Sequence, residues 1–239
     1  MDENSGETSS RICFKCLNPL SRCFCGDLKE VDSGIKFIFL MHPKEAKRQR
    51  TGTGRLAHIR LPESEILVGV DFTNDEHLNE LLSSPEYFPV LLYPGNDART
   101  ASTPGFKEEI GNRKLLIIII DSTWFCSKKM IKLSTNVNSL PKLSFSGSYK
   151  SIFTFKREPA EYCVSTIESC YYIIRELQET DIAKKDADPE PLMDVFKKMI
   201  AYQLNRENER IQSGLPGSHA HDWKYTKVKE IPEYLRVES

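Results

Sequence analysis

The chain has 239 residues, of which 39% are hydrophobic and 28% are charged, and its formal net charge is -1. That length supports the core of one large domain with a small appendage, and the near-zero charge excludes a general electrostatic attraction to nucleic acid. No apolar run approaches the roughly 18–20 residues that span a bilayer, and residues 1–10 lack the basic and apolar regions of a signal peptide. The seven cysteines, an odd number, favour a reducing compartment, so the chain is expected to be soluble and cytoplasmic.

The first predicted feature is a metal-binding knuckle within residues 1–30, after a disordered start. Two residues separate the first pair of cysteines, one separates the second pair, and six lie between the pairs. This spacing is typical of a tetrahedral thiolate site, and zinc is the expected ion. A redox site and an iron–sulfur cluster are the alternatives. The expected ligands are Cys13, Cys16, Cys23 and Cys25. The other cysteines, predicted to be small buried hydrophobic residues, are Cys126, Cys163 and Cys170.

Apolar segments and turn signals then alternate along the chain. Strands are expected at residues 35–41, 65–70, 89–93 and 115–120, with a short helix at 75–83. Strand-like alternation resumes at 143–145 and 151–155. This order of elements predicts an α/β fold with a mainly parallel sheet flanked by helices.

Two helices are expected after the sheet. Apolar residues recur at helical spacing from Ser165 to Glu179, and Glu168 follows Ser165 by three residues, as in a capping box. The second helix is expected at 191–210. The main domain is therefore expected at 31–210, and residues 211–239, with glycine, proline and scattered charge, are expected to form a surface tail.

The most informative segment is Asp121-Ser122-Thr123-Trp124, which directly follows the apolar strand at 115–120. Ligands of open α/β sheets bind at the carboxyl ends of the strands. The alternative is that Asp121 and Ser122 only cap a helix beginning near Trp124.

Loops at other strand ends have the same polar character, as in Tyr93-Pro94-Gly95-Asn96 after the strand at 89–93. Backbone amides, hydroxyls, an aromatic ring and a carboxylate suit a nucleoside-like ligand. The sequence has no G-x-G-x-x-G motif and no P-loop, so an adenosine ligand other than a dinucleotide or a nucleoside triphosphate is expected.

Five motifs in sequence order carry a family resemblance. They are the cysteine knuckle, His42-Pro43-x-Glu45 with Thr53-Gly54-Arg55-Leu56, Leu92-Tyr93-Pro94, Asp121-x-Thr123-Trp124, and Arg157-Glu158-Pro159 with Ser165-Thr166-x-Glu168. From about residue 11 to residue 177 the chain resembles the DTW-domain proteins. The resemblance implies a SPOUT-like fold with a deep trefoil knot, which strand and helix patterns alone would exclude. It also implies a catalytic domain that transfers the 3-amino-3-carboxypropyl group of S-adenosylmethionine to N3 of a tRNA uridine, releasing methylthioadenosine.

The same resemblance implies that the loops after the strands bind S-adenosylmethionine. Asp121 is expected to be the general base that removes the N3 proton; alternatively it orients its loop or binds the ammonium group of the cofactor. Trp124 is expected to fill the interface between sheet and helix, with base stacking as the alternative. The residues expected at this pocket are Leu92, Tyr93, Pro94, Gly95, Asp121, Ser122, Thr123, Trp124, Ser165 and Thr166.

Basic residues after the first strand are expected to contact the tRNA backbone, with a merely solvated surface as the alternative. They are Lys44, Lys47, Arg48, Arg50 and Arg55. Arg55 is suited to clamp a carboxylate or a phosphate through two hydrogen bonds, unless it is an ordinary surface arginine. The protein is expected to act as a monomer. Two other functions stay open: an RNA methyltransferase of the same fold, and a zinc-knuckle RNA-binding protein without turnover.

Overall fold

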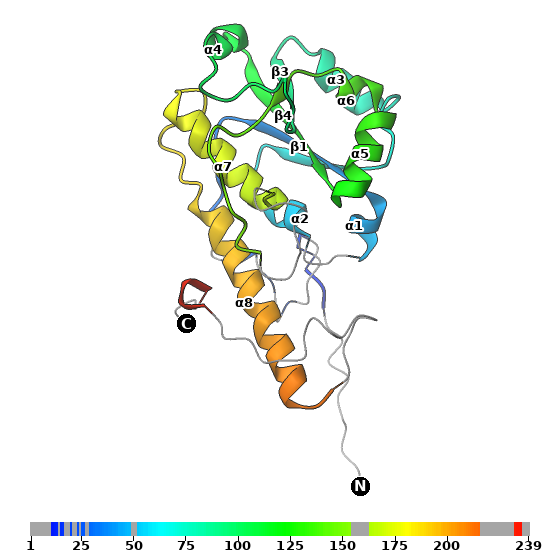
Figure 1. Cartoon of the computed structure of the whole chain (residues 1–239), viewed down its shortest axis with the longest axis vertical. Helices are drawn as coiled ribbons and strands as arrows, with labels where there is room; N and C mark the ends of the chain where they lie inside the picture. The colour runs from blue at the N-terminus through cyan, green and yellow to red at the C-terminus, as the bar shows by residue number, and fades with distance from the viewer. Residues whose placement is uncertain are drawn as a thin grey trace.

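The computed structural model describes residues 11–13, 15–16, 20, 23, 25–26, 29–48, 52–153, 163–215 and 232–235. Within these ranges five strands form one parallel sheet, in the spatial order β2-β1-β4-β3-β5 (Figure 1). The strands are β1 (Lys36–Met41), β2 (Ser64–Val68), β3 (Tyr87–Leu92), β4 (Lys114–Asp121) and β5 (Lys142–Leu143).

The sheet is buried on both faces because its central strands are almost entirely apolar. β4 carries the run of leucines and isoleucines and pairs in parallel with β1 on one side and β3 on the other. Successive side chains alternate between the two faces, so that Phe37 and Phe39 enter one core while Ile38 and Leu40 enter the other. Continuous apolar strands of this kind are typical of parallel sheets that are covered on both sides.

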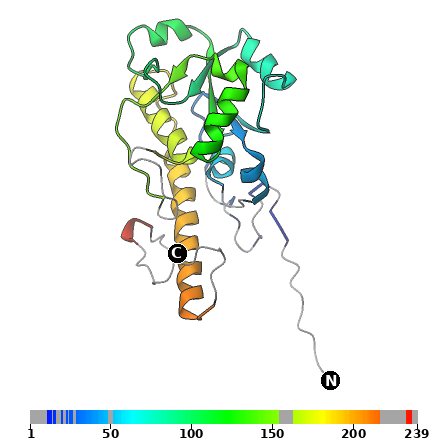
Figure 2. The same ribbon diagram turned by 45° about the vertical axis from the view of Figure 1, so that its right-hand side comes forward.

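Helices cover the two faces separately (Figures 1 and 2). α2, α4, α7 and α8 pack on the face of Phe37, whereas α3, α5 and α6 pack on the face of Ile38. None of the helices in the described ranges has the length and hydropathy needed to span a bilayer. The helices are α1 (Pro43–Arg48), α2 (Thr53–His58), α3 (Glu76–Ser83), α4 (Phe106–Ile110), α5 (Trp124–Leu133), α6 (Thr135–Asn138), α7 (Thr166–Glu179), α8 (Glu190–Gln212) and the 3-10 turn η3 (Glu233–Leu235).

The α/β class and the parallel sheet predicted from the sequence are confirmed. The predicted strand at 143–145 is wrong beyond Leu143, where β5 ends, and residues 151–153 form no strand. The reason is that the backbone N–H groups of Ser146 and Ile152 donate to carboxylates of α7 and not to a neighbouring strand. The trefoil knot stays a prediction, because the chain path between residues 153 and 163 lies outside the described ranges.

The strand order creates a crevice at the carboxyl edge of the sheet. β1 and β4 are neighbours, yet the chain leaves β1 toward β2 on one side and leaves β4 toward β5 on the other. In open α/β sheets, ligands bind outside the carboxyl ends of two strands whose connections diverge in this way. The residues that follow β1 and β4 are therefore expected to form a ligand-binding site.

Candidate active site

A cavity of about 700 Å³ opens at this edge of the sheet, within the size range of small-molecule sites. Its walls come from the ends of β3, β4 and β5, the first turns of α5 and α7, the loop after β5, and the helices α1 and α2. These segments are distant in the sequence and meet only because parallel strands end at one edge. The cavity is the strongest candidate for a ligand site in the described ranges.

Asp121 ends β4 and is held inside this cavity. Its side chain is only 6% exposed, and its Oδ1 atom accepts a hydrogen bond of 2.7 Å from the hydroxyl of Thr166. Its backbone carbonyl accepts from the N–H of His42 at 3.1 Å, which ties the end of β4 to the end of β1. Asp121 is thus held by two other segments of the chain, its carboxylate by Thr166 and its backbone by His42.

Asp121 and Ser122 do not cap the following helix, so that alternative is wrong. The N-cap of α5 is Thr123, whose side chain accepts from the N–H of Cys126 at 3.4 Å. The Ser122 hydroxyl donates to the Thr123 carbonyl instead. Because Thr123 is the N-cap, the carboxylate of Asp121 is not used as a helix cap and faces the cavity.

The first turn of α2 approaches the Asp121 carboxylate more closely than any side chain would allow. A Cβ atom on Gly54 would lie 2.4 Å from Oδ2 of Asp121 and 2.6 Å from its Cγ. Only glycine fits at this position without displacing the carboxylate. Thr53 and, from α1, Glu45 are also buried and line the cavity, so a second carboxylate lies in the same site.

Aromatic side chains form one wall of the cavity. The rings of Tyr93 and Trp124 lie 6.0 Å apart between centroids and are tilted by 48°. Trp124 is half-buried and belongs to the cavity lining, so the expectation that it fills the core between sheet and helix is wrong. The buried side of α5 is formed instead by Ser127, Met130 and Ile131.

Two buried glutamates of α7 hold the wall formed by the loop after β5. Glu168 accepts hydrogen bonds from the hydroxyl of Ser151, the N–H of Ile152, and both the N–H and hydroxyl of Ser165, at 2.6–2.8 Å. The predicted capping box between Ser165 and Glu168 is thereby confirmed. Each of these carboxylate bonds is charge-assisted and so stronger than a neutral hydrogen bond.

Glu176, two turns further along α7, holds the preceding part of the same loop. Its carboxylate accepts from the N–H groups of Ser146 and Gly147 at 2.9 Å and from the hydroxyl of Tyr149 at 2.8 Å. Burial and this hydrogen bond to Glu176 raise the pKa of Tyr149 above its ordinary value, so the phenol stays protonated as the donor. The loop from Ser144 to Phe153, which we call the clamped loop, is therefore fastened to α7 at two points.

Most residues expected at the cofactor pocket line this cavity. Gly95 is the exception, since it is exposed beside Asp97 and Lys142 and is not part of the cavity lining. Residues that the sequence pattern missed include Phe125, Tyr149 and Ser169, which carry no motif signal of their own. The predicted residues brought together are Leu92, Tyr93, Pro94, Asp121, Ser122, Thr123, Trp124, Ser165 and Thr166.

The basic residues expected to meet tRNA separate into two groups. Lys44 and Lys47 are exposed on α1. Arg55 turns inward instead, and its Nη2 donates to the carbonyl of Ala46 at 2.9 Å, which joins α2 to the end of α1. The side chain of Arg48, all of Arg50 and the motif Arg157-Glu158-Pro159 lie outside the described residues.

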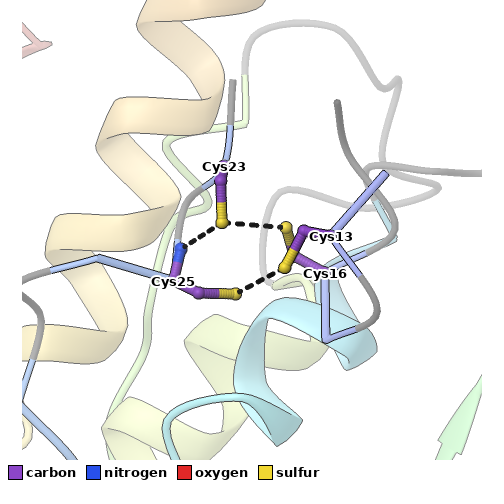
Figure 3. A group of neighbouring side chains, drawn as sticks. All are labelled: Cys13, Cys16, Cys23 and Cys25. Carbon is purple, nitrogen blue, oxygen red and sulfur yellow. Dashed lines mark hydrogen bonds between the residues drawn. The ribbon is translucent and has the colours of Figure 1, made fainter. Parts of the chain in front are cut away.

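The four N-terminal cysteines converge as their spacing predicts (Figure 3). Their sulfur atoms all lie within 4.8 Å of one another, with 3.7 Å between Cys13 and Cys25 and 3.8 Å between Cys16 and Cys23. A disulfide needs about 2.05 Å, whereas tetrahedral Zn–S bonds of about 2.3 Å place sulfur atoms roughly 3.8 Å apart. The arrangement therefore fits a four-thiolate metal site.

Arg60 is a buried cation beside this cluster. Its burial lowers its pKa, and the nearby Cys25, Cys23 and Glu30 oppose that effect. The other cysteines differ among themselves: Cys163 and Cys170 are buried, as predicted, whereas Cys126 is only half-buried. Burial, followed by the nearby charge of Asp121, raises the pKa of the Cys170 thiol, which makes it inert.

Comparison with known proteins places these features in a family. Over 164 aligned residues the chain is 27% identical to tRNA-uridine aminocarboxypropyltransferase 2 of Drosophila melanogaster, covering 66% of this chain and 62% of the fly protein. It is also 25% identical over 235 residues to tRNA-uridine aminocarboxypropyltransferase A of Arabidopsis thaliana, covering 84% of each chain. The chain thus spans less than two thirds of the length of the fly relative. No solved structure matches it.

The family assignment rests on a match between the DTW domain family and residues 10–204 of this chain. That range begins just before the cysteine cluster and ends within α8, so it includes Asp121, Thr123, Trp124 and the whole cavity. This protein therefore belongs to the DTW-domain family.

Proposed function

We propose that this protein transfers the 3-amino-3-carboxypropyl group of S-adenosylmethionine to N3 of a uridine in tRNA. The observation that carries the proposal is the buried Asp121 carboxylate, which ends β4 inside a cavity of about 700 Å³. The names of the two relatives support the same chemistry. The DTW-domain match includes the residues of this cavity, so membership of the family also supports this activity.

The composition of the cavity suits S-adenosylmethionine. Tyr93 and Trp124 offer ring faces for a purine, and Leu92 and Leu143 offer apolar contact. Asp121 and Glu45 supply negative charge for a ligand that carries a sulfonium and an ammonium group. When bound, S-adenosylmethionine supplies a carbon activated by its positively charged sulfur and leaves as methylthioadenosine.

In this proposal the protein contributes a base and a fixed orientation. Asp121 accepts the N3 proton of uracil, so that the nitrogen electron pair is free to form the new N–C bond while the C–S bond breaks. Thr166 and Gly54 keep the carboxylate in one position, because one donates to Oδ1 and the other packs against Oδ2. The clamped loop contributes part of the cavity wall.

The test is mass spectrometry of unmodified tRNA after incubation with the full chain and S-adenosylmethionine. The proposal predicts aminocarboxypropyl-uridine in the tRNA and methylthioadenosine as the small product. A methylated nucleoside with S-adenosylhomocysteine would identify a methyltransferase. Bound but unmodified tRNA would identify a binding protein.

We further propose that the four-cysteine cluster holds one structural zinc ion. Four thiolates complete a tetrahedral shell and leave no position for a substrate, so the ion would stabilise the N-terminal segment and not take part in transfer. The buried guanidinium of Arg60 would offset part of the negative charge of such a site. None of the four cysteines lines the cavity, which agrees with a structural role.

A further inference from the structure

Phe125 is the most exposed large hydrophobic side chain in the described ranges. It is 85% exposed in the first turn of α5, yet it belongs to the lining of the cavity, so it stands at the cavity mouth. Its neighbour Trp124 turns inward against Tyr93. This exposed aromatic ring at the cavity entrance belongs to neither hydrophobic core of the described residues.

Lysines continue the same face of α5 away from the cavity. Lys128, Lys129 and Lys132 follow Phe125 by three, four and seven residues, which is the spacing of one helix face. All three are exposed, and α5 contains no acidic residue. From Phe125 to Lys132 the helix rises by about 10 Å.

The positive charge of this face is not compensated by ion pairs. Exposed lysines elsewhere include paired ones, as Lys107 and Lys185 are with Asp181, and Lys184 is with Asp32. Among the residues that the structure describes, no ion-pair partner is present for the three lysines of α5. On a chain whose net charge is -1, such a strip marks a surface for an anionic partner.

The strip is continuous with the exposed lysines of α1. In Figures 1 and 2, α1 and α5 lie side by side at the edge of the sheet. Burial lowers the pKa of His42, and the positive charges of Lys44 and Lys129 lower it further, so both lysines lie near this histidine. The two helices therefore form one basic surface beside the cavity mouth.

We propose that Phe125 and the lysines of α5 bind the unpaired RNA strand that carries the target uridine, with a neighbouring base stacked on the Phe125 ring. This inference rests on the proposed function. The N3 atom of a paired uridine lies in the base pair, so the reactive nucleotide must be unpaired when it enters the cavity. Proteins bind unpaired RNA through stacking on aromatic side chains and phosphate contacts to lysines, and both lie here along one helix.

The test compares Phe125→Ala and Phe125→Trp in the full chain, by fluorescence anisotropy with labelled unmodified tRNA. Phe125→Ala should weaken tRNA binding by about tenfold, and Phe125→Trp should retain binding, because a stacking platform is restored. Affinity for S-adenosylmethionine, measured by calorimetry, should fall much less than tRNA affinity in Phe125→Ala, because the exposed ring stands at the mouth of the cavity. The matched control is Tyr234→Ala, which removes an aromatic ring that is 53% exposed in η3, remote from the cavity.

The proposed contacts between the lysines of α5 and RNA phosphates are tested with the triple variant Lys128→Ala/Lys129→Ala/Lys132→Ala. The plot of log affinity against log salt concentration has a negative slope. The magnitude of this slope should decrease by about two to three, since each lost phosphate contact removes slightly less than one unit. The matched control, Lys107→Ala/Lys184→Ala/Lys185→Ala, changes the net charge equally but removes lysines that are paired with aspartates. Its salt slope should equal that of the wild type.

Several results would overturn the inference. They are wild-type tRNA affinity and transfer in both Phe125→Ala and the triple lysine variant, an equal loss in the controls, and a loss of S-adenosylmethionine affinity in Phe125→Ala as large as its loss of tRNA affinity. Loss of binding to phosphatidylserine vesicles with intact tRNA binding would assign the surface to a membrane and also overturn it. A wild-type protein that binds tRNA through α5 but transfers nothing would overturn the proposed function and support the RNA surface.

Discussion

Asp121 is held in place by residues that lie far from it in the sequence. Thr166 donates to one carboxylate oxygen, and the Cα of Gly54 packs against the other. The sequence indicated the importance of the polar residues after β4, but it did not distinguish a helix cap from a ligand-facing carboxylate. The cap is Thr123, because its side chain accepts from the otherwise free N–H of Cys126 in the first turn of α5.

The first prediction concerns the role of Asp121 as a base. Asp121→Asn keeps the size and the hydrogen bond of the side chain but cannot accept a proton. We expect kcat for aminocarboxypropyl transfer to fall by about 100-fold or more, and the affinity for S-adenosylmethionine to fall by a smaller factor through the lost negative charge. Single-turnover kinetics and calorimetry measure the two quantities. Weaker cofactor binding with nearly normal turnover of the bound enzyme would make Asp121 an anchor.

The second prediction concerns the close approach of Gly54. Gly54→Ala places a Cβ atom 2.4 Å from Oδ2 of Asp121, so the carboxylate must move. We expect transfer to slow by about 100-fold, as displacements near 1 Å can cause. Gly26→Ala is the matched control, because a Cβ atom there meets nothing within 4 Å. Equal activity in both variants would show that the position of the carboxylate is not critical.

At the scale of elements, α7 organises the site through the two buried carboxylates on its inner side. Glu168 could be found from the sequence, because it occupies the third position of a capping box. Glu176 could not, because a glutamate within an amphipathic helix normally faces solvent. Its burial depends on the backbone N–H groups of the clamped loop, which are 29 and 30 residues away in the sequence.

The third prediction tests this clamp. Glu176→Ala leaves the N–H groups of Ser146 and Gly147 without their acceptor, so we expect a loss of about 2 kcal/mol in the free energy of unfolding. Hydrogen exchange of the clamped loop should accelerate, and affinity for S-adenosylmethionine should fall severalfold. Glu179→Ala, an exposed glutamate on the same helix, is the control. A loop that exchanges at the wild-type rate in Glu176→Ala would argue against the clamp.

The fourth prediction concerns the pH dependence of stability near α7. Burial, and then the hydrogen bond to Glu176, raises the pKa of Tyr149 in the folded protein. The unfolded chain therefore loses this proton first, at about pH 10, and the contribution of Tyr149 to stability declines as pH rises further. Burial and Glu190 likewise raise the pKa of Tyr171, to about 12. Denaturation between pH 9 and 11 should show a smaller decline for Tyr149→Phe than for the wild type; an identical decline would contradict this account.

At the scale of the whole molecule, the doubly covered sheet supports the site, while the cysteine cluster stands apart from it. The core of the sheet is formed by side chains that alternate between two faces, and it needs no ligand to pack. Among the residues that the structure describes, the four cysteines belong to neither hydrophobic core, although Cys16 itself is buried. Short segments of this kind are commonly folded by their metal.

The fifth prediction concerns removal of that metal. Chelation, or Cys16→Ser, should release one zinc ion per chain, lower the melting temperature and speed hydrogen exchange in the described residues 29–31 after the cluster. Affinity for S-adenosylmethionine should be retained, because no ligand of the cluster lines the cavity. Metal analysis by mass spectrometry checks the first effect, with Cys126→Ser as the control that should keep the ion. A protein purified with no bound metal and a normal melting temperature would contradict the zinc proposal.

The sequence by itself determined the α/β class, the strands at the centre of the sheet, the capping box of α7 and the four-cysteine site. These features depend on residues that are neighbours in the chain, through hydrophobic periodicity, cap chemistry and ligand spacing. Only the tertiary structure decided which polar residue faces the cavity, why position 54 is a glycine, which loop α7 holds, and that Phe125 is exposed beside it. Each of these depends on contacts between segments tens of residues apart, and local patterns carry no record of such contacts.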